Sequence, residues 1–314
     1  MKVFHRLDEI AGHSGPASVA IGNFDGVHLG HQALIGGLVS HAREAVTRPV
    51  ALTFFPHPAE VLRPTGKLER LTTTEEKLAL LEALGVESTL VQQFDPSLAA
   101  LAPEVFFDRF LVQGLKARSV HVGDGFVFGR NRSGTVATLA ELCAPRGVLL
   151  VTQPAVALND ERVSSTRIRR RVLEGDTTGA ARMLGRPYFL TGQVQHGHHR
   201  GTAMGFPTAN LRFPEGKVLP KPGVYVMRVE WQRQRFRAVA NLGVRPTFAQ
   251  DGGSAPALEV HLLDFRSKLY DEHLRVEFFE RVRDEQRFSS IDDLKAQIAR
   301  DVESARASRS FSLG

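Results

Sequence analysis

Apolar runs typical of buried strands alternate with segments of helical spacing in the first part of the chain. The predicted strands cover residues 18–24, 50–55, 88–94, 119–122 and 147–152. The predicted helices cover residues 31–45, 74–84, 103–112, 135–143, 165–173 and 179–184, and Thr73 with Glu76 forms a capping box before the second of them. This alternation predicts a parallel sheet covered by helices, with ligands bound at the carboxyl ends of the strands.

The pattern changes after Gly185 and Pro187, where short alternating runs punctuated by Gly and Pro replace the helical segments. Runs such as YFLTGQV and GVYVMRVE are typical of a small antiparallel barrel or sandwich. A last helix is expected to begin after Ser290, because acidic residues occupy its first turn. We therefore predict domains at residues 1–186 and 187–305, followed by a disordered tail at residues 306–314.

Composition narrows the class of protein without identifying it. The 314 residues are 42% hydrophobic and 24% charged, with no apolar run of membrane-spanning length, so we expect a globular protein with no membrane partner. The first residues lack the apolar segment of a signal peptide, which favours a cytoplasmic location. The single cysteine, Cys143, excludes an internal disulfide and is expected to be a buried thiol. A net charge of +6 would suit either nucleic acid or a polyanionic small molecule.

Residues 19–35 have the sequence VAIGNFDGVHLGHQALI, in which an apolar strand is followed by a short turn and a helical segment. Gly22, Gly26 and Gly30 remove side-chain bulk, so a nucleotide's phosphates can approach the free N–H groups of the helix start. His28 and His31 are three residues apart and would occupy neighbouring positions on one helix face. The segment therefore predicts a phosphate-binding turn with two imidazoles beside it.

Three interpretations of the histidine pair stay open from these residues alone. A zinc site would need a third ligand, and no cluster with ligand spacing is visible nearby. In phosphate chemistry, imidazole N–H groups would stabilise the α and β phosphates of ATP as pyrophosphate leaves. The histidines could also simply cap a helix. A second motif, VSSTRIR at residues 163–169, favours phosphate chemistry, because hydroxyls and arginines at a helix start would form a second phosphate clamp.

Four segments of the first half resemble the adenylyltransferase half of the bacterial bifunctional riboflavin kinase/FAD synthetase family. They are GNFDGVHLGH, TFFPHP at residues 53–58, GDGFVFGRNRSG at residues 123–134, and VSSTRIR. The resemblance implies a Rossmann-like nucleotidyltransferase α/β/α domain in which His28 and His31 are catalytic and His57 lies near the flavin phosphate. The further ATP-binding residues that it implies are Gly22, Phe24, Gly30, Ser164, Ser165, Thr166 and Arg169.

One position departs from the pattern of this family. The residue before Phe126 is commonly Asn or Asp, and here it is Gly125, with Asp124 one residue earlier. If that side chain helps to place the nucleotide or a metal ion, the enzyme either uses Asp124 instead or adenylylates less efficiently.

A glycine-rich stretch at residues 192–211, GQVQHGHHRGTAMGFPTANL, opens the second half. Backbone N–H groups of such an arch can wrap a triphosphate, and a hydroxyl and an amide oxygen just after it can hold Mg²⁺. From here onward the chain resembles the riboflavin kinase barrel. The segments concerned are PTAN at residues 207–210, PGVY at 222–225, NLGVRPTF at 241–248, LEVHLLDF at 258–265 and LYDEHLRVEFFERVRDEQRF at 269–288.

The resemblance also implies roles for single residues of this antiparallel β-barrel. Glu259 would be the general base that accepts the proton of the ribityl 5′ hydroxyl, since an alcohol attacking a γ-phosphoryl group needs a nearby acceptor. Arg283 would lie near the flavin, and Thr208 and Asn210 would bind Mg²⁺. The residues expected to bind ATP in the kinase half are Gly197, Gly201, Gly205 and Thr208.

The leading hypothesis is a two-domain transferase of flavin biosynthesis that uses ATP twice. Riboflavin would be phosphorylated to FMN in the barrel, and FMN would be adenylylated to FAD in the first domain. One alternative is a riboflavin kinase with a weak or decayed adenylyltransferase half, and another is a basic RNA-binding protein with a nucleotidyltransferase-like domain. The leading hypothesis implies riboflavin, FMN, FAD and ATP as ligands, Mg²⁺ as cofactor, no nucleic-acid partner, and a monomer or weak oligomer.

Overall fold

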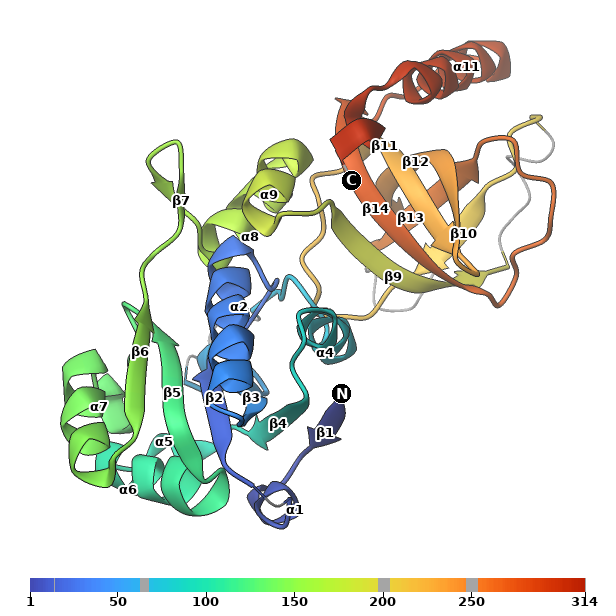
Figure 1. The fold of residues 1–314 in the computed structure, drawn as a ribbon. Coiled ribbons are helices and arrows are strands. Elements are labelled where there is room, and N and C mark those ends of the chain that lie inside the picture. The colour runs from blue at the N-terminus through green and yellow to red at the C-terminus, as the bar shows by residue number, and fades with distance from the viewer. Residues whose placement is uncertain (14, 63–67, 197–203, 247–253, 314) are drawn as a thin grey trace. The chain divides into compact units, whose positions relative to one another are not determined.

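A computed structural model describes residues 1–13, 15–62, 68–196, 204–246 and 254–313 (Figure 1). The chain forms two compact units, Met1–Ser165 and Thr166–Gly314. The first contains a parallel sheet with helices, and the second contains a closed antiparallel barrel and a final helix. This order of elements confirms the predicted fold class.

The sheet of the first unit has the strand order β1-β4-β3-β2-β5-β6, and all its pairings are parallel. The strands are β1 (Lys2–Phe4), β2 (Ala17–Ile21), β3 (Arg48–Phe55), β4 (Ser88–Gln93), β5 (Ala117–Gly123) and β6 (Leu149–Gln153). The strand order reverses direction between β2 and β5, because β3 and β4 extend to one side and β5 and β6 to the other. The crevice at such a switch point is where ligands bind in open α/β sheets.

Helices cover both faces of this sheet, as Figure 1 shows for α2 lying over it. Alternate residues of β2 point to opposite faces, so Ala20 packs in a cluster with Leu38 of α2, while Val19 and Ile21 pack in another with Phe107. The helices before the switch to the second unit are α1 (Leu7–Ala11), α2 (Leu29–Glu44), α3 (Pro58–Leu62), α4 (Thr74–Ala83), α5 (Pro96–Ala99), α6 (Pro103–Phe106) and α7 (Val136–Cys143).

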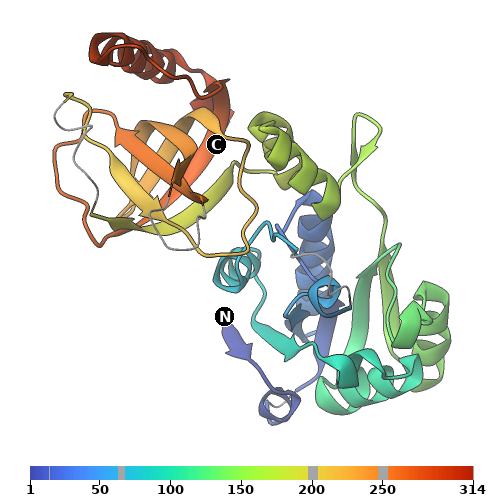
Figure 2. The ribbon, with the colours of Figure 1, turned by 180° about the vertical axis from the view of Figure 1, so that it is seen from behind.

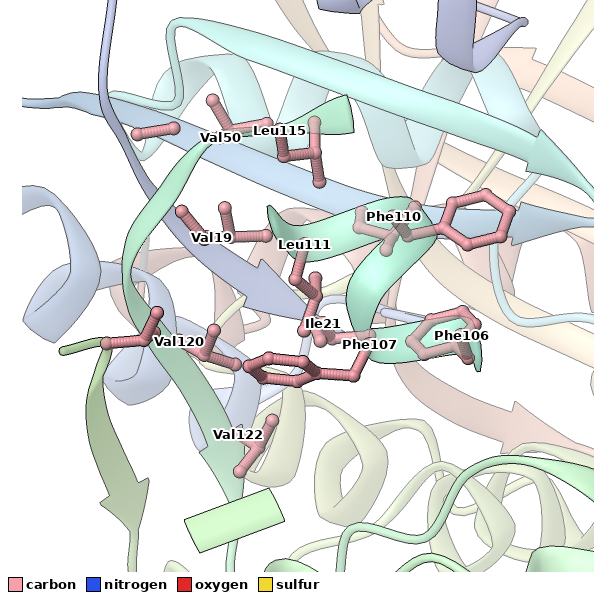
Figure 3. Packing of buried hydrophobic residues seen from close by; sticks show 14 of the residues in the cluster. Val19, Ile21, Val50, Phe106, Phe107, Phe110, Leu111, Leu115, Val120 and Val122 are labelled. Carbon is pink, nitrogen blue, oxygen red and sulfur yellow. The ribbon is translucent and has the colours of Figure 1, made fainter. Parts of the chain in front are cut away.

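The predicted helix at residues 103–112 differs from what the structure contains. Only α6 is α-helical, and Phe107–Gly114 (η1) is a π-helix, with the Leu115 N–H donating to Phe110 O at 2.9 Å. The wider turn keeps Phe106, Phe107, Phe110, Leu111 and Leu115 in one buried cluster against the sheet (Figure 3). Periodicity did not reveal this change of helix type, because the apolar spacing of both types is similar over so few turns.

The remaining differences in the first unit are small. Strand β2 ends three residues earlier than predicted, because Phe24 already has a left-handed φ of 51°. The capping box of Thr73 and Glu76 is confirmed, and Cys143 is buried with its thiol pKa raised to about 11 by burial. The elements that the sequence did not predict are β1, α1, α3, α5, the 3₁₀ turns η2 (Arg130–Arg132) and η3 (Ala144–Arg146), and the short hairpin of β7 (Ala157–Leu158) and β8 (Glu161–Arg162).

The second unit is organised around a closed barrel with the strand order β10-β13-β12-β11-β14-β9. Its strands are β9 (Tyr188–Gln195), β10 (Ala209–Arg212), β11 (Gly223–Trp231), β12 (Gln234–Pro246), β13 (Ser254–Leu262) and β14 (His273–Arg283). Helix α11 (Ile291–Ala307) begins at the predicted cap Ser290 and lies along the outside of the barrel in both views (Figures 1 and 2). Its Val302 and Ala305 pack against Val224 and Val226.

Two helices, α8 (Ser165–Glu174) and α9 (Thr177–Leu184), precede the barrel. The hydroxyls of Thr177 and Thr178 both donate to Phe279 O of β14 at 3.2 Å. These contacts explain why the compact units divide after Ser165, before the predicted domain boundary at residue 186.

The C-terminal end differs from the disordered tail expected at residues 306–314. Helix α11 continues to Ala307, and a 3₁₀ turn, η4, follows at Ser310–Leu313. Phe311 packs on Phe279, with ring centroids 4.8 Å apart, and the Arg237 guanidinium lies 4.7 Å from its ring centroid. The polar composition of the tail gave no sign that one aromatic residue, Phe311, packs partly buried against the core.

A line of buried polar groups runs beneath α2. His121 Nε2 lies 3.1 Å from Ser119 Oγ, which donates to Ser18 Oγ at 2.8 Å. Burial, and to a smaller extent His41, lowers the pKa of His121 from 6.5 to about 4. The folded protein therefore holds this imidazole neutral in a range where the unfolded chain binds a proton.

We predict that His121 makes folding stability fall as the pH decreases from 6.5 to about 4, by about 3 kcal/mol in total. Above pH 6.5 the imidazole is neutral in both states and has no such effect. Urea unfolding at several pH values in this range measures the loss. His121→Gln should weaken the dependence and leave the part that His31 contributes, whereas replacing the exposed His5 by Gln should leave it unchanged. Equal pH dependences for the wild type and His121→Gln would contradict the prediction.

Candidate active sites

The first candidate site lies on the turn between β2 and α2. Its backbone has left-handed φ values at Phe24, Gly26 (80°) and Val27 (39°), so the chain reverses sharply before the helix. His28 is the N-cap of α2, and its Nδ1 accepts a hydrogen bond from the His31 N–H at 3.3 Å. The predicted strand, turn and helix are therefore present, with one histidine capping and the other in the first helical turn.

The two imidazoles are stacked, with centroids 3.7 Å apart and planes 13° from parallel. A Cβ atom at Gly30 would lie 3.2 Å from His28 Cε1, and one at Gly22 would lie 3.0 Å from the Phe24 ring. Phe24 in turn contacts His31 edge-on at 5.4 Å. The two glycines thus make room for the aromatic rings of the site. This role adds to the one predicted from the sequence, which was to let a phosphate approach the backbone.

Burial lowers the pKa of His31 well below its usual 6.5, and the nearby His28 and Lys77 lower it further. Its Nδ1 is buried and has no hydrogen-bond partner among the described residues. A neutral imidazole with one unsatisfied nitrogen is suited to a hydrogen bond with a bound ligand.

The Asp25 carboxylate holds the turn in place. It accepts hydrogen bonds from the N–H groups of Leu71 (2.9 Å) and Thr72 (3.1 Å) and from Thr72 Oγ1 (3.3 Å), and it is only 5% exposed. Ser165 Oγ donates to Asp25 O at 2.9 Å, so this residue of the VSSTRIR motif meets the histidine turn. Ser164 precedes α8, and Thr166 and Arg169 lie in its first turns.

Beside the turn, at the carboxyl end of β3, is a small pocket that includes the predicted flavin residue His57. His57 Nδ1 accepts a hydrogen bond from the Ala59 N–H at 3.1 Å. The pocket is also lined by four residues that were not predicted from the sequence, namely Asp25, Arg70, Thr72 and Lys77. No motif could have identified Lys77, since its position in α4 resembles that of any helical lysine.

Gly125, which stands where the family commonly has Asn or Asp, lies beside an ion pair. The carboxylate of the preceding Asp124 forms an ion pair with Arg162 at 2.8 Å, and a Cβ at Gly125 would lie 3.5 Å from the same guanidinium. Asp124 is therefore already engaged with β8, close to the place where the family usually has an amide or carboxylate.

The second candidate site is a cavity of about 390 Å³ between the barrel and α11. Glu259 of β13 lies between Asn210 of β10 and Asn241 of β12 in the strand register, so three polar residues stand side by side on adjacent strands. The cavity is lined by Met204, Phe206, Thr208, Val224, Val239, Ala240, Asn241, Glu259, His261, Arg283, Glu285, Gln286, Phe288, Leu294, Ile298 and Asp301. This mixture of apolar walls and a few polar groups suits a small organic ligand.

Hydrogen bonds fix the polar walls of the cavity. His261 Nδ1 donates to Pro207 O at 2.8 Å and so holds the start of the PTAN segment. Arg283 donates to Asp301 of α11 from Nε (3.0 Å) and from its terminal nitrogen (2.7 Å). The guanidinium predicted to bind flavin is therefore also a structural link between β14 and the last helix.

Part of the predicted nucleotide arch falls outside the described residues, namely Gly197 and Gly201. Gly205 is described and has a φ of 87°, a conformation that favours glycine. Among the described residues, no group of three or more His, Cys, Asp and Glu side chains could hold a metal ion. Nor does the described part of the chain contain a helix long and apolar enough to cross a membrane.

Comparison with known proteins also divides the chain into two regions, close to the two compact units. Residues 11–167 match the family model for FAD synthetase, and residues 184–309 match the one for riboflavin kinase. The chain is also similar to a crystal structure described as a macrolide-efflux protein from Streptococcus pneumoniae, with a TM-score of 0.89, 32% identity and 98% of both chains covered.

Two curated relatives are similar over nearly the whole chain. The bifunctional riboflavin kinase/FMN adenylyltransferase of Bacillus subtilis (strain 168) is 35% identical over 289 residues, with 91% of this chain and 90% of that protein covered. The protein of the same name from Pseudomonas fluorescens is 40% identical over 287 residues, with 91% of each covered. The chain therefore belongs to the family of bifunctional riboflavin kinase/FMN adenylyltransferases.

Proposed function

We propose that this enzyme of flavin biosynthesis phosphorylates riboflavin in the barrel cavity and adenylylates the resulting FMN at the histidine turn, with ATP as co-substrate of both steps. The main support is the presence of two separate sites in one chain, one in each region matched by a family model. An apolar cavity with a carboxylate suits an alcohol acceptor, and a helix start with two imidazoles suits phosphate.

At the histidine turn, a phosphate oxygen of FMN would attack the α-phosphorus of ATP, and pyrophosphate would leave. The N–H groups of His28 and His31 would donate to the phosphates as charge moves onto the leaving group. Because burial keeps His31 neutral, its ring donates a hydrogen bond without adding a buried positive charge. Gly22, Phe24 and Gly30 shape this turn, and Ser164, Ser165, Thr166 and Arg169 would close on the nucleotide.

In the cavity, Glu259 would accept the proton of the ribityl 5′ hydroxyl while that oxygen attacks the γ-phosphorus of ATP. Thr208 lines the cavity and Asn210 is paired with Glu259 in the strand register, so a hydroxyl and an amide oxygen fit the hard ligands that Mg²⁺ prefers. The ion would neutralise charge on the phosphates. Arg283 would contact the flavin from the wall where Asp301 holds it.

The domain boundary at residue 186, the cytoplasmic location, the monomeric or weakly oligomeric state and the lack of a nucleic-acid partner stay predictions. So does the alternative of a decayed adenylyltransferase half, for which Gly125 and the engaged Asp124 are the specific observations. Feeding FMN instead of riboflavin tests that alternative directly, because FAD formation then depends on the first site alone.

Incubation of the pure protein with riboflavin, ATP and Mg²⁺ should yield FMN and then FAD, as resolved by liquid chromatography. Chelation of Mg²⁺ with EDTA should stop FMN formation, and added Mg²⁺ should restore it. FMN without FAD, even when FMN is supplied, would favour the decayed half. If neither flavin forms and the protein instead binds RNA in a salt-sensitive manner, the proposed function is wrong.

The two activities should respond to different substitutions. His28→Ala combined with His31→Ala should abolish FAD while FMN accumulates, since the transition-state donors are lost only in the first site. Glu259→Gln should reduce FMN formation by about 100-fold or more, yet FAD should still form from supplied FMN. The exposed Glu280→Gln serves as the control for Glu259. Loss of both activities in either folded variant would contradict separate sites.

A further inference from the structure

The pocket beside β3 contains a buried amine that the adenylyl-transfer chemistry above does not use. Lys77 of α4 is only 7% exposed. Its Nζ donates to Asn23 O at 3.2 Å and to Thr53 Oγ1 at 3.0 Å, and Thr53 Oγ1 donates to the same Asn23 O at 3.2 Å. These two acceptors satisfy two of the three N–H donors of the ammonium group.

The positive charge of this pocket is only partly balanced. The pKa of Lys77 is lowered to about 8, chiefly because the amine is buried; Asp25 opposes this shift and Arg70 adds to it. The Asp25 carboxylate already accepts hydrogen bonds from Leu71 and Thr72. Arg70 also lines the pocket, and its ion pair with Glu60 is long, at 3.7 Å. The wall of the pocket therefore presents two cations to an entering anion, and its one carboxylate, Asp25, has its oxygens occupied; Glu60 pairs with Arg70 from outside the wall.

The size of the pocket limits what can enter. Its volume is about 20 Å³, which admits a group the size of one water molecule and excludes an adenine or isoalloxazine ring. The hydroxyls of Thr72 and Thr74 and the ring of His57 complete the polar part of the wall. A single phosphate oxygen matches this volume, this charge and these donors.

The location of the pocket indicates which phosphate would bind. The switch point of the sheet lies between β2 and β5, where the crevice would take ATP. The pocket lies on the other side of β2, at the end of β3, yet close enough for the charge of Lys77 to lower the pKa of His31. An acceptor phosphate bound there would adjoin the histidine pair from the side opposite the nucleotide.

We propose that Lys77 and Arg70 bind the phosphate of the acceptor FMN, and that the Lys77 pocket thereby selects the phosphorylated flavin and positions its attacking oxygen. The proposal rests on the adenylyltransferase activity proposed above. One phosphate oxygen occupies the pocket, which leaves another free to attack the α-phosphorus. Riboflavin has no group of this charge and so gains nothing from the pocket.

The test is the steady-state rate of FAD formation from FMN and ATP in full-length variants. Lys77→Met should raise the KM for FMN by about tenfold or more, because a charge-assisted hydrogen bond is lost, and should leave the KM for ATP unchanged. Lys116→Met, at an exposed position of the same unit, is the matched control. Inorganic phosphate should compete with FMN in the wild type and compete less well in Lys77→Met.

Other outcomes overturn the proposal. A rise in the KM for ATP alone would assign the pocket to a nucleotide phosphate. A lower kcat with both KM values unchanged would mean that Lys77 acts on the chemical step and does not bind the phosphate of FMN. If Lys77→Met does not fold, Arg70→Gln gives the same measurement, and an unchanged KM for FMN there contradicts the proposal. A wild type that makes no FAD would refute the proposed function itself, which keeps the two failures distinguishable.

Discussion

The first site depends on the buried Asp25 carboxylate. Placing a charge in the interior is costly unless hydrogen bonds replace its hydration, and here Leu71 and Thr72 supply them. These hydrogen bonds connect the turn after β2 to the segment before α4, although the two segments are far apart in sequence. The left-handed φ of Phe24, the cap at His28 and the link to Ser165 all belong to the conformation that this carboxylate holds.

The second site is held by strand register and by α11, because its cavity must be open to ligands and yet rigid. Strand register places Glu259 between two asparagines without any special turn, and α11 closes the outside through the Arg283–Asp301 ion pair. Asp301 is almost fully buried, so removing either partner would leave a charge with no counterion. The same helix therefore supports both the stability of the unit and the shape of its cavity.

The sequence predicted the features that follow from local pattern. Single segments are enough to recognise the buried parallel strands and the capping residues. They also reveal the change from helical segments to short alternating apolar runs near residue 186. The π-helix after Phe106, the ordered Phe311 and the pocket around Lys77 were not predictable, because each depends on which distant residues meet. The resemblance implied the roles of His28, His31, Thr208, Asn210 and Glu259. The structure adds the cap at His28 and the strand register that places Glu259 beside Asn210.

At the histidine turn, His31 presents a neutral imidazole to phosphate. This neutral state is tested most directly by following the ring signals of His31 by NMR as the pH of the folded protein is lowered, with assignment by comparison to His31→Gln. His31 should stay neutral through its ordinary titration range around pH 6.5, because burial lowers its pKa well below that value. Titration of His31 near 6.5 would show that the folded protein does not hold this ring neutral.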